Sequence, residues 1–415
     1  RRPRWPRPIC SEPDVTSAAC PEVAAFLNAR GALTDWLLTH ALPFWSSTGT
    51  DWTEGGFVER CDLTGHALHE PRRTRVVARQ IYVFAVAPSL GWTGPADALV
   101  QHGLDFLLHR LQQPDGTFAS SVQTDGTVVN GRFDLYEQAF ALFALARAHA
   151  HLPNARDTLA QQAAQTLGAL NLRYRHPRRG YEESEPPSVP LKSNPHMHLF
   201  EATLAWEACT PDDQIATWRD LSDELAHLAL DRLIDPDTGA LSEYFDHDWQ
   251  RMPDALGDVV EPGHQFEWAW LLIRWGTARQ RPEALQAARR LIDLAEQHGI
   301  CPTRGVAINQ INHAMAPIDG HAKLWPQTER IKAWCAMHSA ASTAQEAAHA
   351  LAQATQAIQG LMPYLSHPTP GLWQEVMLPD GSFTSEPCRA SSLYHIVCAI
   401  ETLHQVQADA PSLTH

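Results

Sequence analysis

A glycine-containing turn recurs six times along the chain, at an interval of about 63 residues. Each copy ends in an apolar residue, and these six marker residues are Phe57, Phe118, Tyr181, Leu241, Val306 and Trp373. Self-similarity at a fixed period of this length is typical of repeat architectures, in which each repeat buries its apolar face against its neighbours.

Two segments with apolar residues at helical spacing lie between consecutive markers. Examples are residues 76–87 and 96–111, 133–150 and 158–172, and 266–275 and 284–294. One further helix is expected before the first marker, at about 21–43, and one after the last, at about 391–406. These two unpaired helices complete a sixth pair if they meet. We therefore predict an all-α fold, an (α/α)6 barrel with short β-hairpins at one end, rather than an open solenoid, whose end repeats need polar caps.

No linker divides the chain, so residues 21–407 are expected to form a single barrel domain. Residues 1–20 have no apolar stretch of the kind that a secretory signal contains, and we interpret them as a disordered leader, with 408–415 as a C-terminal tail. The eight cysteines are scattered, without metal-ligand spacing. We interpret them as reduced thiols of a cytoplasmic protein.

Composition narrows the possible partners. The formal net charge is −15, which disfavours nucleic acid and anionic membranes as partners. No apolar run approaches the roughly 18 residues that a membrane span needs. The chain also contains 22 histidines and 14 tryptophans, both of which suit polar ligands with apolar faces. A small molecule is therefore the expected ligand. For the protein itself, we expect a monomer or a homodimer.

Polar and aromatic residues begin the helix that follows each marker, and a closed ring directs them towards one cavity. Three histidines there, His198, His264 and His395, are spaced by 66 and 131 residues, about one and two repeats. The pairs His198 with Glu201 and His264 with Glu267 each share a helical face. The other candidates for the cavity are Arg79, Tyr136, Asn194, Trp325, Gln327 and Glu329.

Structural interpretations compete with these assignments. A single histidine in an apolar helix is usually a hydrogen-bonded core residue, and Arg79 could instead form a buried ion pair with Glu59. The glutamates could serve only to hold the imidazoles in one tautomer. A zinc site at His196, His198 and Glu201 is disfavoured, because the two histidines point about 200° apart on a helix. No Walker loop, dinucleotide turn or nucleophile elbow is present, so we expect neither a metal nor a cofactor.

Five strings in order, TRVVARQIY, NPHMHLFEA, EPGHQFEWAWLL, KLWPQTERIKA and SSLYHI, resemble the N-acylglucosamine 2-epimerase superfamily, most closely its bacterial mannose isomerase branch. The resemblance covers about residues 21–407. It implies an (α/α)6 barrel that isomerises or epimerises free sugars without metal or redox cofactor. It also implies that His264 and His395 are the acid and base, and that Arg79, Asn194, His198, Glu267 and Trp325 line the sugar site.

The expected function is therefore aldose–ketose isomerisation of D-mannose and D-fructose, with D-lyxose and D-xylulose as a related pair, through an enediolate. Isomerases and 2-epimerases share that intermediate, so a 2-epimerase acting on mannose, cellobiose or N-acylglucosamine remains an alternative. A second alternative is a glycoside hydrolase, which needs a pair of carboxylates and for which Glu201, Glu267 and Glu329 are candidates. A non-catalytic sugar-binding protein is a third.

Overall fold

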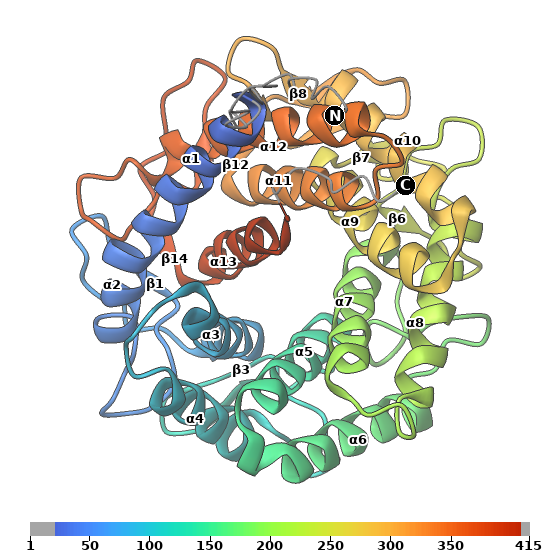
Figure 1. Cartoon of the computed structure of the whole chain (residues 1–415). Helices are drawn as coiled ribbons and strands as arrows, with labels where there is room; N and C mark the ends of the chain where they lie inside the picture. Colours follow the sequence, from blue (N-terminus) through green and yellow to red (C-terminus); the bar gives the residue numbers. More distant parts are fainter. Residues whose placement is uncertain (1–20, 408–415) are drawn as a thin grey trace, which may run out of the picture.

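The computed structural model describes residues 21–407 and forms a closed ring of two concentric layers of helices (Figure 1). The inner layer consists of α3 (Thr74–Val86), α5 (Leu135–His151), α7 (Ser193–Cys209), α9 (Pro262–Arg279), α11 (Leu324–Ser339) and α13 (Ala390–Gln405). These helices surround a common axis. The predicted helices are found at the predicted places, with ends that differ by a few residues.

The outer layer alternates with the inner one along the chain. It consists of α1 (Pro21–Trp36) with α2 (Leu42–Ser47), α4 (Ala96–Phe106), α6 (Arg156–Arg173), α8 (Ala216–Leu228), α10 (Pro282–Gly299) and α12 (Ala344–Leu365). A π-helical turn over Leu37–Ala41 joins α1 to α2, so these two form one continuous outer helix. Each inner helix packs against the outer helix of its own hairpin, which gives the predicted six helical pairs.

The ring closes between the two ends of the chain. Helix α13 contacts both α11 and α3, and the outer helices α1 and α12 also contact each other. Strands β1 (Arg60–Cys61) and β14 (Cys388–Arg389) pair antiparallel, with the free thiols of Cys61 and Cys388 on opposite residues. Trp45 stacks on Trp373 with ring centroids 5.1 Å apart. These contacts confirm the closed (α/α)6 barrel.

The marker residues lie where the chain returns from an outer helix. Five of them pair antiparallel with a residue just beyond that helix: Phe57 with Thr50, Phe118 with Gln112, Tyr181 with Arg175, Leu241 with Ile234 and Val306 with Cys301. The glycine in each turn is explained by its backbone. Gly180 has φ 78°, and a Cβ there would lie 2.8 Å from His196 Nε2.

Short strands gather at the N-terminal ends of the inner helices. Besides β1 and β14 they are β2 (Arg72–Arg73), β3 (Ser121–Val122), β4 (Val128–Asn130), β5 (Leu191–Lys192), β6 (Tyr244–Phe245), β7 (Val259–Val260), β8 (Ile300–Cys301), β9 (Val306–Ala307), β10 (Gln310–Asn312), β11 (Pro317–Asp319), β12 (Ala322–Lys323) and β13 (Val376–Met377). Several pairs, such as β2 with β3, β5 with β6 and β12 with β13, link neighbouring repeats. The hairpins therefore lie at one end of the barrel, as predicted.

The inner helices are buried on nearly all sides, because the outer layer covers one face and the neighbouring inner helices pack along the flanks. Their continuous apolar pattern follows from this double burial. Within residues 21–407, no helix is both long and apolar enough to cross a membrane. The predicted leader over 1–20 and tail over 408–415 lie outside the described residues.

Candidate active site

A cavity of about 320 Å³ opens at the hairpin end of the barrel, among the first turns of the inner helices. That volume is within the range of about 300–1,000 Å³ that is usual for small-molecule sites. Seven of the predicted residues line it: Arg79, Tyr136, Asn194, His198, His264, Glu267 and Trp325. His395 also lines it, so eight of the eleven predicted side chains meet in one space.

The three cavity histidines share one hydrogen-bonding arrangement. In each, Nδ1 contacts a buried glutamate: His264 with Glu243 at 2.8 Å, His395 with Glu329 at 2.8 Å and His198 with Glu201 at 3.2 Å. A hydrogen bond at Nδ1 fixes the ring orientation and leaves Nε2 as the edge for a ligand. Three imidazole Nε2 atoms are therefore available to a bound molecule.

His264 lies beside two carboxylates. Glu243 Oε2 is 2.8 Å from its Nδ1 and Glu261 Oε2 is 3.6 Å away. Burial alone lowers the pKa of an imidazole, but here Glu243 and Glu261 outweigh it and raise the pKa of His264 to about 10. His264 is thus protonated at neutral pH and can donate a proton.

His395 lies in the opposite electrostatic environment. Burial, together with the positive charges of Arg79 and Lys332, holds its pKa well below the usual range. The imidazole is therefore neutral at pH 7, with its proton on Nδ1 towards Glu329 and a lone pair on Nε2. Two imidazoles in one cavity with pKa values displaced in opposite directions have the properties of an acid and a base.

Arg79 faces the cavity and forms no ion pair with a carboxylate of residues 21–407. Its Nη2 donates to Tyr136 Oη at 2.8 Å and its Nη1 approaches Ser391 O at 3.4 Å, while its Nε has no partner among the described residues. The guanidinium lies 4.2 Å from the Phe140 ring centroid. Glu59, the alternative partner considered from the sequence, instead binds Arg73. The charge of Arg79 is therefore available to an anionic group in the cavity.

Trp325 lies between His264 and His395, the two imidazoles whose pKa values are shifted in opposite directions. Its ring centroid is 5.0 Å from that of His264 and 5.9 Å from that of His395. The side chain of Asn194 also lines the cavity, and its Oδ1 is buried without a hydrogen-bond partner among residues 21–407. An indole face and an unused amide oxygen suit a ligand with both C–H and hydroxyl surfaces.

A buried network of charges lies beneath the cavity. The ammonium of Lys332 contacts Glu329 and is 3.6 Å from Glu267 Oε1. Burial raises the pKa values of Glu267 and Glu329 to about 7, although Lys332 acts to lower both. Glu201 differs, because His198 and Lys332 outweigh the effect of burial and lower its pKa to about 2. Glu201 and Glu329 thus contact Nδ1 of His198 and His395 and do not themselves line the cavity.

Gln327, predicted to bind substrate, lies outside the cavity. Its side-chain amide binds the backbone N and O of Ala307, at 2.8 and 2.9 Å, and does not line the cavity. Gln138 and Gln265 bind the backbone of markers Phe118 and Leu241 in the same way. Gln327 therefore fastens a hairpin to an inner helix, since a buried backbone needs partners of this kind.

Sequence reasoning missed Glu243, although a signal for it exists. A glutamate follows the marker by two residues in four repeats, at Glu59, Glu183, Glu243 and Glu375. Each accepts a hydrogen bond from the backbone N–H of the residue that precedes an inner helix. Lys332 and Lys323 were also missed, because a lone cation has no spacing signal.

The site contains groups of histidine and glutamate whose ligand atoms lie within 4.8 Å of one another. One group is His198, Glu201 and Glu267, and another is Glu267, Glu329 and His395. The ammonium of Lys332 already supplies a cation between these carboxylates, which disfavours a divalent ion there. His196 of the HxH motif points elsewhere, and its Nε2 accepts from Tyr181 N at 3.2 Å.

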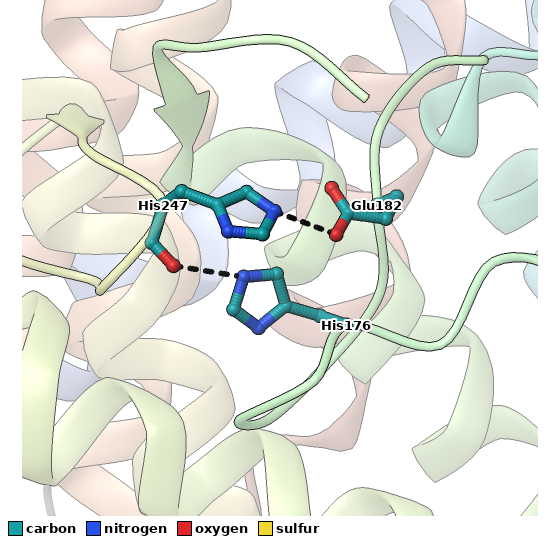
Figure 2. Close-up of side chains that lie close together, drawn as sticks. All are labelled: His176, Glu182 and His247. Atoms are coloured by element: carbon teal, nitrogen blue, oxygen red, sulfur yellow. Dashed lines mark hydrogen bonds and ion pairs between the residues drawn. The ribbon is translucent and has the colours of Figure 1, made fainter. Parts of the chain in front are cut away.

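A third group, His176, Glu182 and His247, lies among the hairpins (Figure 2). His176 Nε2 contacts His247 O at 3.1 Å, and its Nδ1 accepts from the backbone N–H groups of Arg178 and Arg179. His247 Nε2 contacts Glu182 Oε1 at 2.8 Å. Because both nitrogens of His176 are used within the protein, this group fits a clasp between two hairpins better than a metal site.

Comparison with known proteins places this geometry among sugar-converting enzymes. The profile of the family described as N-acylglucosamine 2-epimerase (GlcNAc 2-epimerase) matches residues 55–399. A Rhizobium meliloti (strain 1021) protein named mannose-6-phosphate isomerase is 44% identical, over 90% of this chain and 96% of its own length. A Thermobifida fusca protein named D-mannose isomerase is 31% identical, over 61% of this chain and 65% of its own length.

A solved structure described as D-mannose isomerase superposes with a TM-score of 0.80 at 21% identity, covering 94% of this chain and all of that chain. At this identity the similarity establishes the fold. The profile match and the more similar relative agree with the expected superfamily.

Proposed function

Because the chain belongs to the N-acylglucosamine 2-epimerase family, we propose that this isomerase or epimerase is an aldose–ketose isomerase acting on D-mannose and D-fructose. Relatives named for mannose isomerisation support the sugar. One is named for the 6-phosphate and the other for free mannose, so the proposal concerns the chemistry at C1 and C2, which both forms share.

The opposite protonation states of His264 and His395 carry the proposal. Neutral His395 Nε2 removes the proton from C2 of the open-chain aldose, and the same nitrogen returns it to C1. His264 donates a proton to O1 as the C2 proton leaves and recovers one from O2 as C1 is protonated. All atoms balance, and general acid and base groups of this kind each contribute about 10²–10⁴ in rate.

Arg79 would stabilise the negative charge that develops on O1 and O2 as the enediol between these steps forms and collapses. Its guanidinium lies in the cavity without a carboxylate partner, so a developing negative charge on O1 or O2 would meet an uncompensated cation. Its charge also helps to keep His395 neutral, since it lowers that pKa. Trp325 would support the C–H face of the sugar, while Asn194 and Glu267 would bind hydroxyl groups.

The displaced pKa values favour isomerisation over 2-epimerisation. A 2-epimerase removes the C2 proton with one base and returns a proton from the opposite face with another. Such a turnover ends with the protons exchanged between the two bases, which would leave His395 charged and His264 neutral. The surroundings disfavour both of these states, because they raise the pKa of His264 and lower the pKa of His395. An isomerase in which His395 shuttles one proton ends with each imidazole as it began.

The test is incubation of the protein with D-mannose in D2O, followed by NMR. Fructose carrying deuterium or transferred hydrogen at C1 is the expected product. Glucose as the main product would instead establish the 2-epimerase alternative. If mannose, lyxose, cellobiose, N-acetylglucosamine and mannose 6-phosphate were all left unchanged, with no C2 exchange, the proposed chemistry would be wrong.

A further inference from the structure

A second chamber of about 990 Å³ lies outside the catalytic cavity and opens to solvent. Six residues line both spaces and mark the passage between them: Arg79, Tyr136, Lys192, Asn194, Arg389 and Ser391. We call the outer chamber the vestibule. A ligand held by His264 and His395 therefore has its far end in this passage or in the vestibule itself.

The charge of the vestibule is opposite to that of the chain. The protein has a net charge of −15, yet seven arginines and lysines line the vestibule against four carboxylates. The cations are Arg60, Arg73, Arg75, Arg79, Arg132, Lys192 and Arg389. A concave wall with one predominant sign of charge concentrates ligands of the opposite sign.

Most of the vestibule carboxylates already have partners. Glu59 binds Arg73 and Glu70 binds Arg60, while Asp134 caps α5 through Tyr136 N at 2.9 Å. Glu183 accepts from the backbone N–H of Lys192, and burial raises its pKa to about 8, so it is largely uncharged at neutral pH. Arg75 and Arg389 are in turn paired with Glu137 and Glu386, so four of the seven cations are already in ion pairs.

Two of the cations have no partner. Within residues 21–407, the side chains of Arg132 and Lys192 form neither an ion pair nor a hydrogen bond, and both are exposed to the vestibule. Lys192 lies at the passage, in β5 directly before α7, and Arg132 lies further out, beyond β4. Their charges are thus available to a ligand that extends outwards from the catalytic cavity.

We propose that the vestibule is a phosphate subsite, in which Lys192 and Arg132 bind the 6-phosphate of a hexose phosphate. The inference rests on the proposed function, since the proposed function places C1 and C2 of the sugar against His264 and His395. The C6 substituent is at the other end of a hexose and so points towards the passage. Arginine and lysine are the usual partners of phosphate oxygens, with arginine able to form two parallel hydrogen bonds.

The experiment compares kcat/KM for mannose 6-phosphate and for free mannose in the wild-type protein, Lys192→Gln, Arg132→Gln and the double variant. The wild-type ratio is expected to exceed about 10, since hydrogen bonds to charged groups contribute about one order of magnitude or more. The ratio should fall several-fold in each single variant and towards 1 in the double variant. Arg219→Gln, on the outer face of α8, serves as a matched loss of one charge and should retain the wild-type ratio.

Ionic strength gives an independent measurement. Raising the salt from about 0.05 to 0.5 M should increase the KM for mannose 6-phosphate several-fold and leave the KM for mannose nearly constant, because exposed charges are screened over about 10 Å at 0.1 M. A wild-type ratio near or below 1, with mannose converted normally, would overturn the phosphate subsite and leave the isomerase proposal intact. A high ratio that both variants retain would also overturn it. Inactivity on both sugars would overturn both proposals.

Discussion

Glu243 Oε2 lies 2.8 Å from Nδ1 of His264, and the same oxygen accepts a hydrogen bond from Ser193 Oγ at 2.8 Å. One carboxylate thus joins the end of a hairpin, the first residue of α7 and an imidazole of α9. Its other oxygen faces the backbone N–H of Glu261 at 3.4 Å. The residue that fastens this corner of the barrel is therefore also the one that keeps His264 charged.

Replacing Glu243 with glutamine should lower the alkaline limit of activity. His264 is proposed to act in its protonated form, so activity is present below its pKa and is lost as pH rises through about 10. Removing the negative charge lowers that pKa towards the unperturbed value of about 6.5. In Glu243→Gln, the alkaline limb of the plot of kcat/KM against pH should therefore shift to lower pH by at least one pH unit.

Glu59→Gln provides the control, because Glu59 occupies the same place in its own repeat and caps Arg73, not an imidazole. It should lose comparable stability while the alkaline limb stays near the wild-type position. If both variants shifted the limb equally, the shift would reflect general loosening of the hairpins, and the assignment of Glu243 as the partner that charges His264 would be rejected.

The ring and the convergence of three histidines were predictable from the sequence, because both depend on the repeat period. Residues at the same phase of a closed repeat occupy equivalent positions around one axis. His198, His264 and His395 therefore converge even where the predicted helix ends differ by a few residues from the observed ones. The two lone helices at the ends of the chain predicted closure in the same way.

The partner of His264 could not be predicted from helical spacing. Glu267 is three residues after His264 on the same helix, but its carboxylate lies near Lys332. Glu261, three residues before His264, is 3.6 Å away, and the hydrogen bond to Nδ1 comes from Glu243 in another segment. Spacing on one helix shows which side chains share a face, whereas side chains from neighbouring elements decide which of them pair. The contact of Gln327 with Ala307 was not predictable for the same reason, since the hairpin brings Ala307 to it.

Alanine at either proposed catalytic histidine should reduce kcat by about 10²–10⁴. His395→Ala removes the base, so exchange of the C2 hydrogen of mannose with D2O should also be lost. His264→Ala leaves that base in place, and slow C2 exchange is expected to continue without matching fructose formation. NMR of mannose in D2O measures both.

His149→Ala is the matched control, because His149 is also a buried histidine of an inner helix but lies against Trp206, away from the cavity. It should turn over mannose at a rate close to that of the wild-type protein. Near-normal turnover by His264→Ala or His395→Ala, with circular dichroism confirming a folded chain, would contradict the assigned roles.

Lys332→Met should destabilise the protein and move the acid limit of activity upwards. Lys332 is fully buried and is the cation of the Glu201, Glu267 and Glu329 cluster, so its loss leaves carboxylates without a partner, at about 3–5 kcal/mol. Lys332 also lowers the pKa of His395, whose neutral form is active above that pKa. Its removal raises the pKa, and the acid limb of kcat/KM should shift to higher pH.

Adding Glu329→Gln to Lys332→Met should recover part of the lost stability in urea unfolding, because the cluster then contains one carboxylate fewer. A double variant as unstable as the sum of the two single variants would show that Lys332 contributes mainly through other contacts, such as the cation–π contact of its ammonium with the Trp270 ring at 4.0 Å, and not as the counter-charge of the carboxylates.

Gln327→Ala should affect stability and not substrate binding. The substitution leaves the buried N–H and C=O of Ala307 without their partners, which costs about 1–3 kcal/mol for each group. Gln265→Ala, which frees the backbone of Leu241 in the same way, should behave alike. Urea unfolding should show a loss of about 2–6 kcal/mol in both variants, with KM for mannose within about twofold of the wild-type value. A large rise in KM in Gln327→Ala without a loss of stability would restore the substrate-binding role that the sequence suggested.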